Sequence, residues 1–206
     1  TQNFTEELAK RVNTFSPEFA ETLAVRIKYI DDLQQDLLNA GVSQDVLKSS
    51  FSTLSGLAIL QTIEETARVD ISQKNVSKFG QVLEDFQDIA KQKKELLVQL
   101  KEATLQIANL RREGGSSALD KFDETLNAAY DYAEKRAVNL DNDIKILQEA
   151  DLAKIESIIK GTVGKLDDAP ADTQDISTVI TRNYKNGYNK PEFLTAEEIA
   201  EHNKKV

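Results

Sequence analysis

Apolar residues recur every three or four positions along most of the chain, which is the spacing of one face of an α-helix. Two stretches, 73–112 and 118–160, keep this spacing over many turns. The apolar positions of the first are Val76, Phe79, Leu83, Phe86, Ala90, Leu97, Leu100, Ile107 and Leu110. Those of the second are Leu119, Phe122, Leu126, Tyr130, Ala133, Ala137, Leu140, Ile144, Leu147, Ile155 and Ile158. Alternating spacings of three and four are typical of coiled coils, and Lys93 and Thr104 interrupt the first series with polar side chains.

A short Gly-Gly-Ser-Ser segment after Glu113 separates these two stretches. Because a short loop between two long amphipathic helices makes them antiparallel neighbours, the sequence predicts a helical hairpin. Arg111 and Arg112 are then expected to lie near Asp120 and Asp123 across the turn. A helix over 73–112 would be about 60 Å long, so we expect an elongated molecule.

Two further helices are predicted before the hairpin. Ser16 and Pro17 mark the start of the first helix, and Gly41 marks its end. Ser43 can cap the second helix, whose pattern fades near Val69. The apolar positions of the first are Phe19, Leu23, Ile27, Ile30, Leu33 and Leu37, and those of the second are Leu47, Phe51, Leu54, Ala58 and Ala67.

The C-terminal part of the chain differs from the rest. Residues 167–172 are rich in aspartate and include Pro170, so this segment is predicted to be a linker. Ile176, Val179, Ile180 and Tyr184 then share one face of a short helix. We therefore expect an antiparallel helical bundle over 1–166, and a tail over 167–206 that consists of a linker and short helices. The sequence leaves open whether the tail docks on its own bundle or on a partner.

Composition supports an all-α chain. There are 8 glycines and 3 prolines, and aromatic residues make up 6% of the sequence. β-Sandwiches and barrels need many turns and therefore more of both turn residues. The predicted fold is all-α, an elongated antiparallel helical bundle with a coiled-coil hairpin and a short helical C-terminal tail.

The residue types that carry most enzyme chemistry are scarce. Cysteine is absent and His202 is the single histidine, which excludes thiolate nucleophiles and cysteine-based metal sites. Adjacent carboxylates such as Glu64 and Glu65 point to different faces of a helix, so they do not form a catalytic pair. We expect no catalytic residue, no metal site and no cofactor.

The net charge of −9 argues against nucleic-acid binding, because a phosphate backbone repels an acidic chain. Basic residues outnumber acidic ones only within 73–112, where Lys91, Lys93 and Lys94 are densest. No apolar run reaches the roughly 18–20 residues that span a bilayer. The composition fits a cytoplasmic protein and a cysteine-free secreted or surface protein equally well.

The leading hypothesis is a non-enzymatic module for protein–protein interaction or structural scaffolding, whose partner is another protein or a second copy. Leftover apolar positions of a helical face often continue into a partner helix, and exposed aromatic residues can anchor a partner. The candidate contacts are Phe79, Leu83, Phe86, Lys91, Lys93, Lys94, Tyr184 and Tyr188.

Two alternatives remain. The first is a membrane-surface, secreted or cell-surface helical protein, such as a curvature scaffold, an adhesin-like protein or a toxin-like protein. The acidic net charge disfavours lipid binding by charge alone. The second is an enzyme, which is disfavoured because a cofactor or partner chain would have to supply the missing reactive groups.

Overall fold

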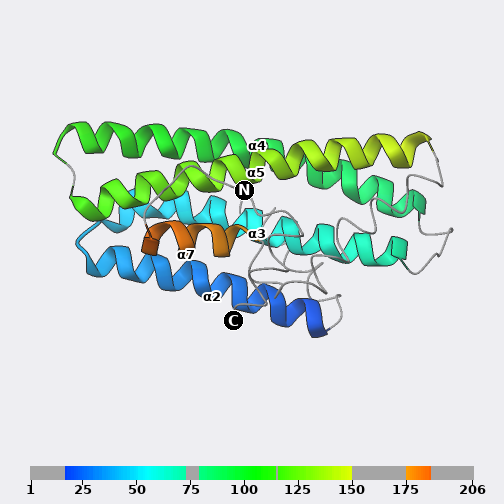
Figure 1. The fold of residues 1–206 in the computed structure, drawn as a ribbon, viewed down its shortest axis with the longest axis horizontal. Helices are drawn as coiled ribbons and strands as arrows, with labels where there is room; N and C mark the ends of the chain where they lie inside the picture. The colour runs from blue at the N-terminus through cyan, green and yellow to red at the C-terminus, as the bar shows by residue number, and fades with distance from the viewer. Residues whose placement is uncertain (1–16, 73–78, 115, 150–174, 187–206) are drawn as a thin grey trace.

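The computed structural model describes residues 17–72, 79–114, 116–149 and 175–186, and this part of the chain is almost entirely α-helical. The helices are α2 (Pro17–Asn39), α3 (Gln44–Ser72), α4 (Phe79–Arg112), α5 (Ser117–Glu149) and α7 (Ile176–Asn186). The four long helices run alternately up and down in an elongated bundle (Figure 1). The predicted all-α fold and the helical bundle are confirmed.

The predicted hairpin is formed by α4 and α5, which are 34 and 33 residues long. Each is about 50 Å long at 1.5 Å per residue. Arg111 joins them beside the turn, because its Nε lies 2.7 Å from an Asp120 oxygen and its NH1 lies 2.6 Å from Asp123. The remaining parts of the predicted stretches, 73–78 and 150–160, lie outside the described residues.

Local sequence also sets the ends of α2 and α3. Pro17 is the first residue of α2. At the other end Gly41 adopts a φ of +94°, which favours glycine, and Val42 N–H donates to the Leu37 carbonyl at 3.0 Å. Ser43 Oγ then accepts a hydrogen bond from Val46 N–H at 3.4 Å. The predicted stop and restart are therefore both present.

Helix α3 is the central helix of the bundle. Every residue from Gly56 to Glu65 is buried, so α3 has no exposed face over its central turns. A Cβ at Gly56 would lie 3.2 Å from Leu96 Cδ1, so glycine allows α3 to approach α4 closely. The expectation of one apolar face was too narrow, because neighbouring helices cover α3 on all sides. The helix also continues to Ser72 instead of fading near Val69.

Helix α7 lies between α2 and α5, alongside the N-terminal half of α3 (Figure 1). Helix α2 packs on α3 and α7, and α5 packs on α4 and α7, so α7 bridges the two outer helices. Ile176 and Ile180 of α7 are buried in the same core as the long helices. The first helix of the tail thus docks on its own bundle.

The packing of α7 explains which tyrosine of α5 is buried. The predicted apolar series of α5 includes Tyr130 and not Tyr132, but Tyr132 is the buried tyrosine. Tyr130 is half-buried, and the Lys101 ammonium lies 5.2 Å from the centre of its ring. Because α7 covers a second side of α5, that helix buries more than the single face that its periodicity indicates.

Core positions of the hairpin should dominate stability. Leu140 is fully buried on α5, so Leu140→Ala is expected to lower the free energy of unfolding by about 2–5 kcal/mol. Lys91 is exposed on α4, and Lys91→Ala should change it by no more than about 0.5 kcal/mol. Urea unfolding of both variants measures the difference, and equal losses would contradict the observed helix orientation.

Candidate functional site

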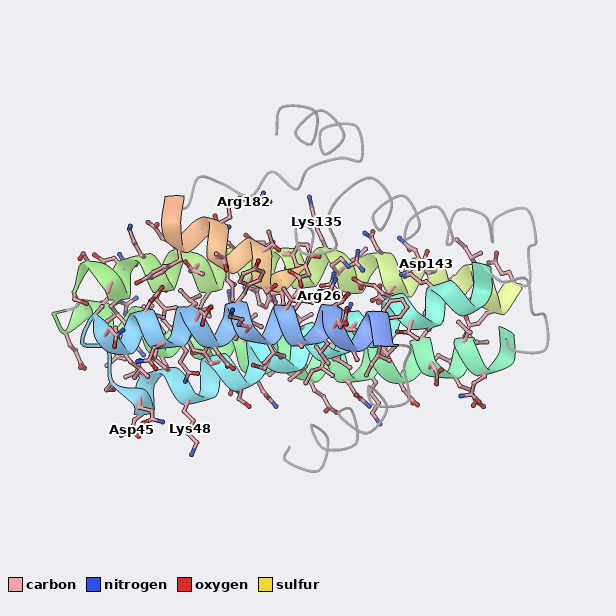
Figure 2. The ribbon with its side chains drawn as sticks, turned by 90° about the horizontal axis from the view of Figure 1, so that it is seen from below. Arg26, Asp45, Lys48, Lys135, Asp143 and Arg182 are labelled. Carbon is pink, nitrogen blue, oxygen red and sulfur yellow. The ribbon has the colours of Figure 1, made fainter. Side chains whose placement is uncertain are left out.

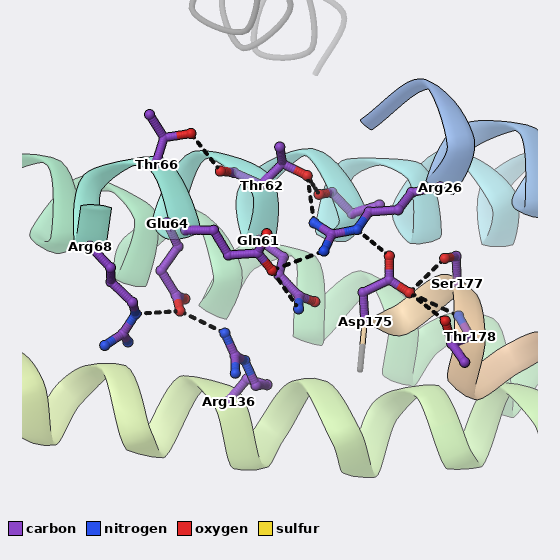
Figure 3. A network of polar contacts seen from close by, with 12 residues as sticks. Arg26, Gln61, Thr62, Glu64, Thr66, Arg68, Arg136, Asp175, Ser177 and Thr178 are labelled. Carbon is purple, nitrogen blue, oxygen red and sulfur yellow. Dashed lines mark hydrogen bonds and ion pairs between the residues drawn. The ribbon is translucent and has the colours of Figure 1, made fainter. Parts of the chain in front are cut away.

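Charged and polar side chains cross the interior of the bundle beside the C-terminal half of α3 (Figure 3). We call this group the buried charge network. It joins all five described helices through side chains of α2, α3, α4 and α5 and of the residue that precedes α7. Its members are Arg26, Gln61, Thr62, Glu64, Glu65, Arg68, Lys93, Tyr132, Arg136, Asp143 and Asp175. Four basic side chains face four carboxylates, so the network is neutral overall.

One half of the network is centred on Glu64 of α3. Its Oε1 lies 2.7 Å from Lys93 Nζ of α4. Its Oε2 lies 2.8 Å from an Arg136 NH2 of α5 and 3.1 Å from Arg68 Nε of α3 itself. Because the Glu64 side chain is 1% exposed, a single carboxylate holds three helices together in the interior.

The surrounding cations keep Glu64 ionised. Burial acts to raise the pKa of Glu64, but Lys93, Arg136 and Arg68 together hold it well below its usual range. Burial and the two arginines lower the pKa of Lys93, while Glu64 opposes that effect. The pKa of Arg136 is raised, because the nearby carboxylates outweigh its burial.

The other half of the network is centred on Arg26 of α2. Its NH1 donates to Thr62 Oγ1 at 2.9 Å, and its NH2 donates to Glu65 Oε1 at 3.0 Å. Its Nε pairs with Asp175 Oδ2. Burial lowers the pKa of Arg26, but Glu65 and Asp175 outweigh it, so the net shift is upward and the guanidinium stays charged.

The Asp175 carboxylate contacts both the start of α7 and the Arg26 guanidinium. Its Oδ1 accepts hydrogen bonds from Ser177 Oγ at 2.6 Å, from Thr178 N–H at 2.9 Å and from Thr178 Oγ1 at 3.0 Å. The backbone bond is that of a helix N-cap. Its Oδ2 faces Arg26. Burial raises the pKa of Asp175, and Arg26 and the three donors oppose that effect.

Gln61 and Tyr132 connect the network to α5. Gln61 Nε2 donates to Glu65 Oε1 at 3.2 Å and to the Tyr132 hydroxyl at 3.1 Å. Burial raises the pKa of Tyr132 to about 12, so its hydroxyl stays protonated at neutral pH. At the outer end, an Arg68 NH1 lies 2.6 Å from Asp143 Oδ2.

A cavity of about 10 Å³ lies against the network. Leu57, Gln61, Lys93, Tyr132, Ala133, Arg136 and Ile176 line it. That volume is enough for about one water molecule. Among the described residues, Arg136 Nε and Glu65 Oε2 are buried atoms with no hydrogen-bond partner. The arrangement therefore binds helices to one another and has room for a solvent molecule rather than a substrate.

The acidic residues of the described part do not gather into a metal site. No group of three histidine, cysteine, aspartate or glutamate side chains in this part could hold a metal ion. Within the network each carboxylate faces a basic side chain instead.

No described helix is both long enough and apolar enough to cross a membrane.

Two of the candidate partner contacts lie inside the bundle. Phe86 is fully buried, and the Arg68 guanidinium carbon lies 5.1 Å from the centre of its ring. Lys93 belongs to the buried charge network. Neither residue is available at the surface, because α3 covers this side of α4. Leu83 is half-buried and packs against the core, and the side chain of Phe79 lies outside the described residues.

The other candidates lie nearer the surface. Lys91 is exposed, and Lys94 is exposed with its Nζ 3.6 Å from Asp141 Oδ2 of α5. Tyr184 is half-buried and packs against the core from α7. Tyr188 lies outside the described residues. The basic cluster of the sequence is thus divided between the surface and the interior.

The sequence pattern indicates Lys93 as a polar interruption of an apolar series, but it gives no prediction that Arg26 is buried. The predicted apolar series of α2 passes through Ile27, although a strict alternation of four and three over the whole series from Phe19 to Leu37 passes through Arg26. Arg26 is 1% exposed, whereas Ile27 is only half-buried. A charged residue at a strict heptad position was the available signal.

Comparisons of the chain with protein-family models, with curated proteins and with solved structures give no match.

Removing the central carboxylate should be costly. In Glu64→Gln, Lys93, Arg68 and Arg136 lose the charge that compensates their burial, so the free energy of unfolding should fall by about 3–5 kcal/mol. The matched control is Glu102→Gln, an exposed position of α4, with an expected change within about 0.5 kcal/mol. Denaturant unfolding compares the two, and a small effect of Glu64→Gln would show that the network contributes little.

Acid should weaken the bundle through the same residue. A folded-state pKa below the ordinary 4.5 means that the contribution of Glu64 is complete above that pH and is lost as the pH falls. Asp175 has a raised pKa and acts in the opposite direction. The free energy of unfolding should therefore fall less steeply between about pH 5 and pH 3 in Glu64→Gln than in the wild-type chain. Parallel slopes would contradict the shifted pKa.

Proposed function

We propose that the protein is a helical interaction module that binds an amphipathic helix of a partner protein along the outer face of α4. One observation carries the proposal. Lysine and apolar side chains share an exposed stripe of α4 at alternating spacings of three and four residues. The stripe consists of Lys91, Lys94, Val98, Lys101 and Leu105. Val98 is 60% exposed and Leu105 is 56% exposed, although their spacing of seven is that of a helix-packing face.

The neighbouring helix extends this stripe. Lys94 lies beside Asp141 of α5, and Lys101 lies over the ring of Tyr130. Val138 is 55% exposed and sits one helical turn before Asp141. The stripe of α4 and this part of α5 therefore share one outer side of the hairpin, with apolar side chains flanked by charge.

The charges of α4 define the partner. Glu84, Asp88, Glu95 and Glu102 follow the other edge of its exposed face. A partner helix with apolar residues seven apart would cover Val98 and Leu105. Acidic residues on one flank of that helix would face the lysines, and basic or neutral residues would face the acidic edge. This asymmetry would also select the direction of the partner helix.

The interior supports the same proposal. The charged groups of the network face one another across the helices, and the adjacent cavity has room for about one water molecule. A bundle fixed in this way offers a rigid outer face. Rigid faces lose little conformational entropy when they bind, which favours recognition of a helix.

A designed peptide tests the proposal. The probe is a helix with leucine at its a and d positions and glutamate at its e and g positions, which repel one another and oppose self-pairing. We expect this probe to bind the full chain and to bind Val98→Ser/Leu105→Ser at least about tenfold more weakly, which is about 1.4 kcal/mol. Isothermal titration calorimetry measures both affinities.

The matched control is Glu95→Ser/Glu102→Ser, which introduces the same residue on the acidic edge of α4. This control should keep the affinity or increase it, because it removes negative charge. An equal loss of affinity in both variants, or no binding to the wild-type chain, would reject the stripe as a docking face. Anionic phosphatidylserine vesicles provide a further arm. Binding to vesicles without binding to the peptide would favour the membrane-surface alternative.

A further inference from the structure

Helix α7 is stabilised mainly by its contacts with the long helices. It is 11 residues long, and isolated helices shorter than about 12–15 residues are marginal in water. Ile176 and Ile180 are buried among the long helices, and the carboxylate of Asp175 pairs with Arg26. Helix α7 therefore depends on the groove between α2 and α5, which is floored by α3.

The groove in turn depends on what α7 brings to it. Without Asp175, the buried Arg26 guanidinium would keep Thr62 and Glu65 but lose the carboxylate at its Nε. Glu65 would still balance the charge of Arg26, but a buried donor that is left without an acceptor is costly. Helix α7 meets these needs with an aspartate at its cap and with isoleucines one and five positions later.

Within this chain the pattern identifies one segment. Aspartate followed directly by isoleucine occurs at Asp70, Asp88, Asp143 and Asp175. Asp175 alone among these has a second isoleucine, Ile180, five positions later. The segment that satisfies the groove is therefore α7, whichever copy of the chain supplies it.

The segment between α5 and α7 is long enough for α7 to reach the groove of its own copy or that of a second copy. Fully extended, the segment 150–175 spans at most about 90 Å. Helix α5, from whose end this segment starts, is about 50 Å long. The recognition contacts all come from side chains at the groove and from α7 itself, so they do not depend on which copy the helix belongs to.

We propose that α7 is an exchangeable element, so that the groove between α2 and α5 binds the α7 of a second copy as well as its own. Reciprocal exchange then gives a two-fold dimer whose new contacts repeat those already made within one chain. This interaction uses the α2–α5 side of the bundle and not the stripe on α4, so it stands independently of the proposed helix-binding function.

Introduced cysteines can test the exchange, because the natural chain has none. Helix α7 packs on α2, and Asp36 of α2 acts with burial to raise the pKa of Tyr184, so positions 36 and 184 suit a cross-link between these two helices. The two single variants Asp36→Cys and Tyr184→Cys are mixed in equal amounts and treated with a short bifunctional thiol reagent. A cross-link between these two variants can join α2 of one copy only to α7 of another.

The matched control pairs Tyr184→Cys with Lys48→Cys. Lys48 is exposed near the start of α3 and lies on the side of the bundle away from Arg182 of α7 (Figure 2). We expect at least about tenfold more cross-linked dimer from the Asp36 pair, with a yield that rises with protein concentration. Equal yields in the two mixtures, or no cross-linked dimer at millimolar protein, would overturn the exchange.

A competition measurement keeps the test decisive if Tyr184→Cys weakens docking. A peptide of residues 174–186 should bind full-length Ile180→Asp, because the introduced charge keeps the α7 of that variant out of the groove. Added to the mixture of Asp36→Cys and Tyr184→Cys, the same peptide should suppress the cross-link between copies. The same peptide with Asp175→Asn should bind at least about tenfold more weakly, because it lacks the charge that faces Arg26. If neither peptide binds, the groove does not accept α7 from outside its own chain and the proposal fails.

Discussion

The buried Glu64 carboxylate must be neutralised where it lies, and this requirement determines how the long helices meet. Lys93 and Arg136 come from two different neighbours of α3, and each lies within 2.8 Å of a Glu64 oxygen. Sliding α4 by one turn, about 5.4 Å, would leave Lys93 buried without its carboxylate and would remove one of the three cations that face Glu64. Leucine, isoleucine and alanine fill much of the core and tolerate shifted packing better than charges do. We infer that the network specifies the register of the bundle.

The buried charge of Arg26 must also be neutralised, and this requirement positions α7. Its Nε faces Asp175, and that carboxylate also caps α7, so the formation of the helix and the neutralisation of Arg26 are coupled. Ile176 and Ile180 add apolar burial but would accept several helix positions. The ion pair therefore decides where α7 sits, although its contribution to net stability is small once desolvation is counted.

Local pattern predicted much of the fold because heptad spacing, caps and glycine stops act over short distances. Most of the network could not be predicted in this way. Periodicity reports one buried face of a helix, whereas α3 is buried all round and α5 is covered on a second side by α7, which explains the error at Tyr132. Lys93 was visible as an interruption, because no apolar neighbour replaced it in the series. Arg26 was hidden, because the adjacent Ile27 continued the pattern almost as well.

Lys93 is buried in the bundle, whereas Lys91 and Lys94 beside it are exposed, so the orientation of one helix sets both the interior and the surface. Adjacent residues on a helix point about 100° apart, so Lys93 turns inward where Lys94 turns outward. Rotating α4 by one residue would bring Lys94 towards Glu64 and expose Lys93, but it would also turn Phe86 and Leu97 of α4 out of their buried positions. The ion pair between Lys93 and Glu64 therefore fixes the rotation of α4 about its own axis. That rotation is what presents Val98 and Leu105 to solvent, so the outer stripe depends on a contact in the centre of the bundle.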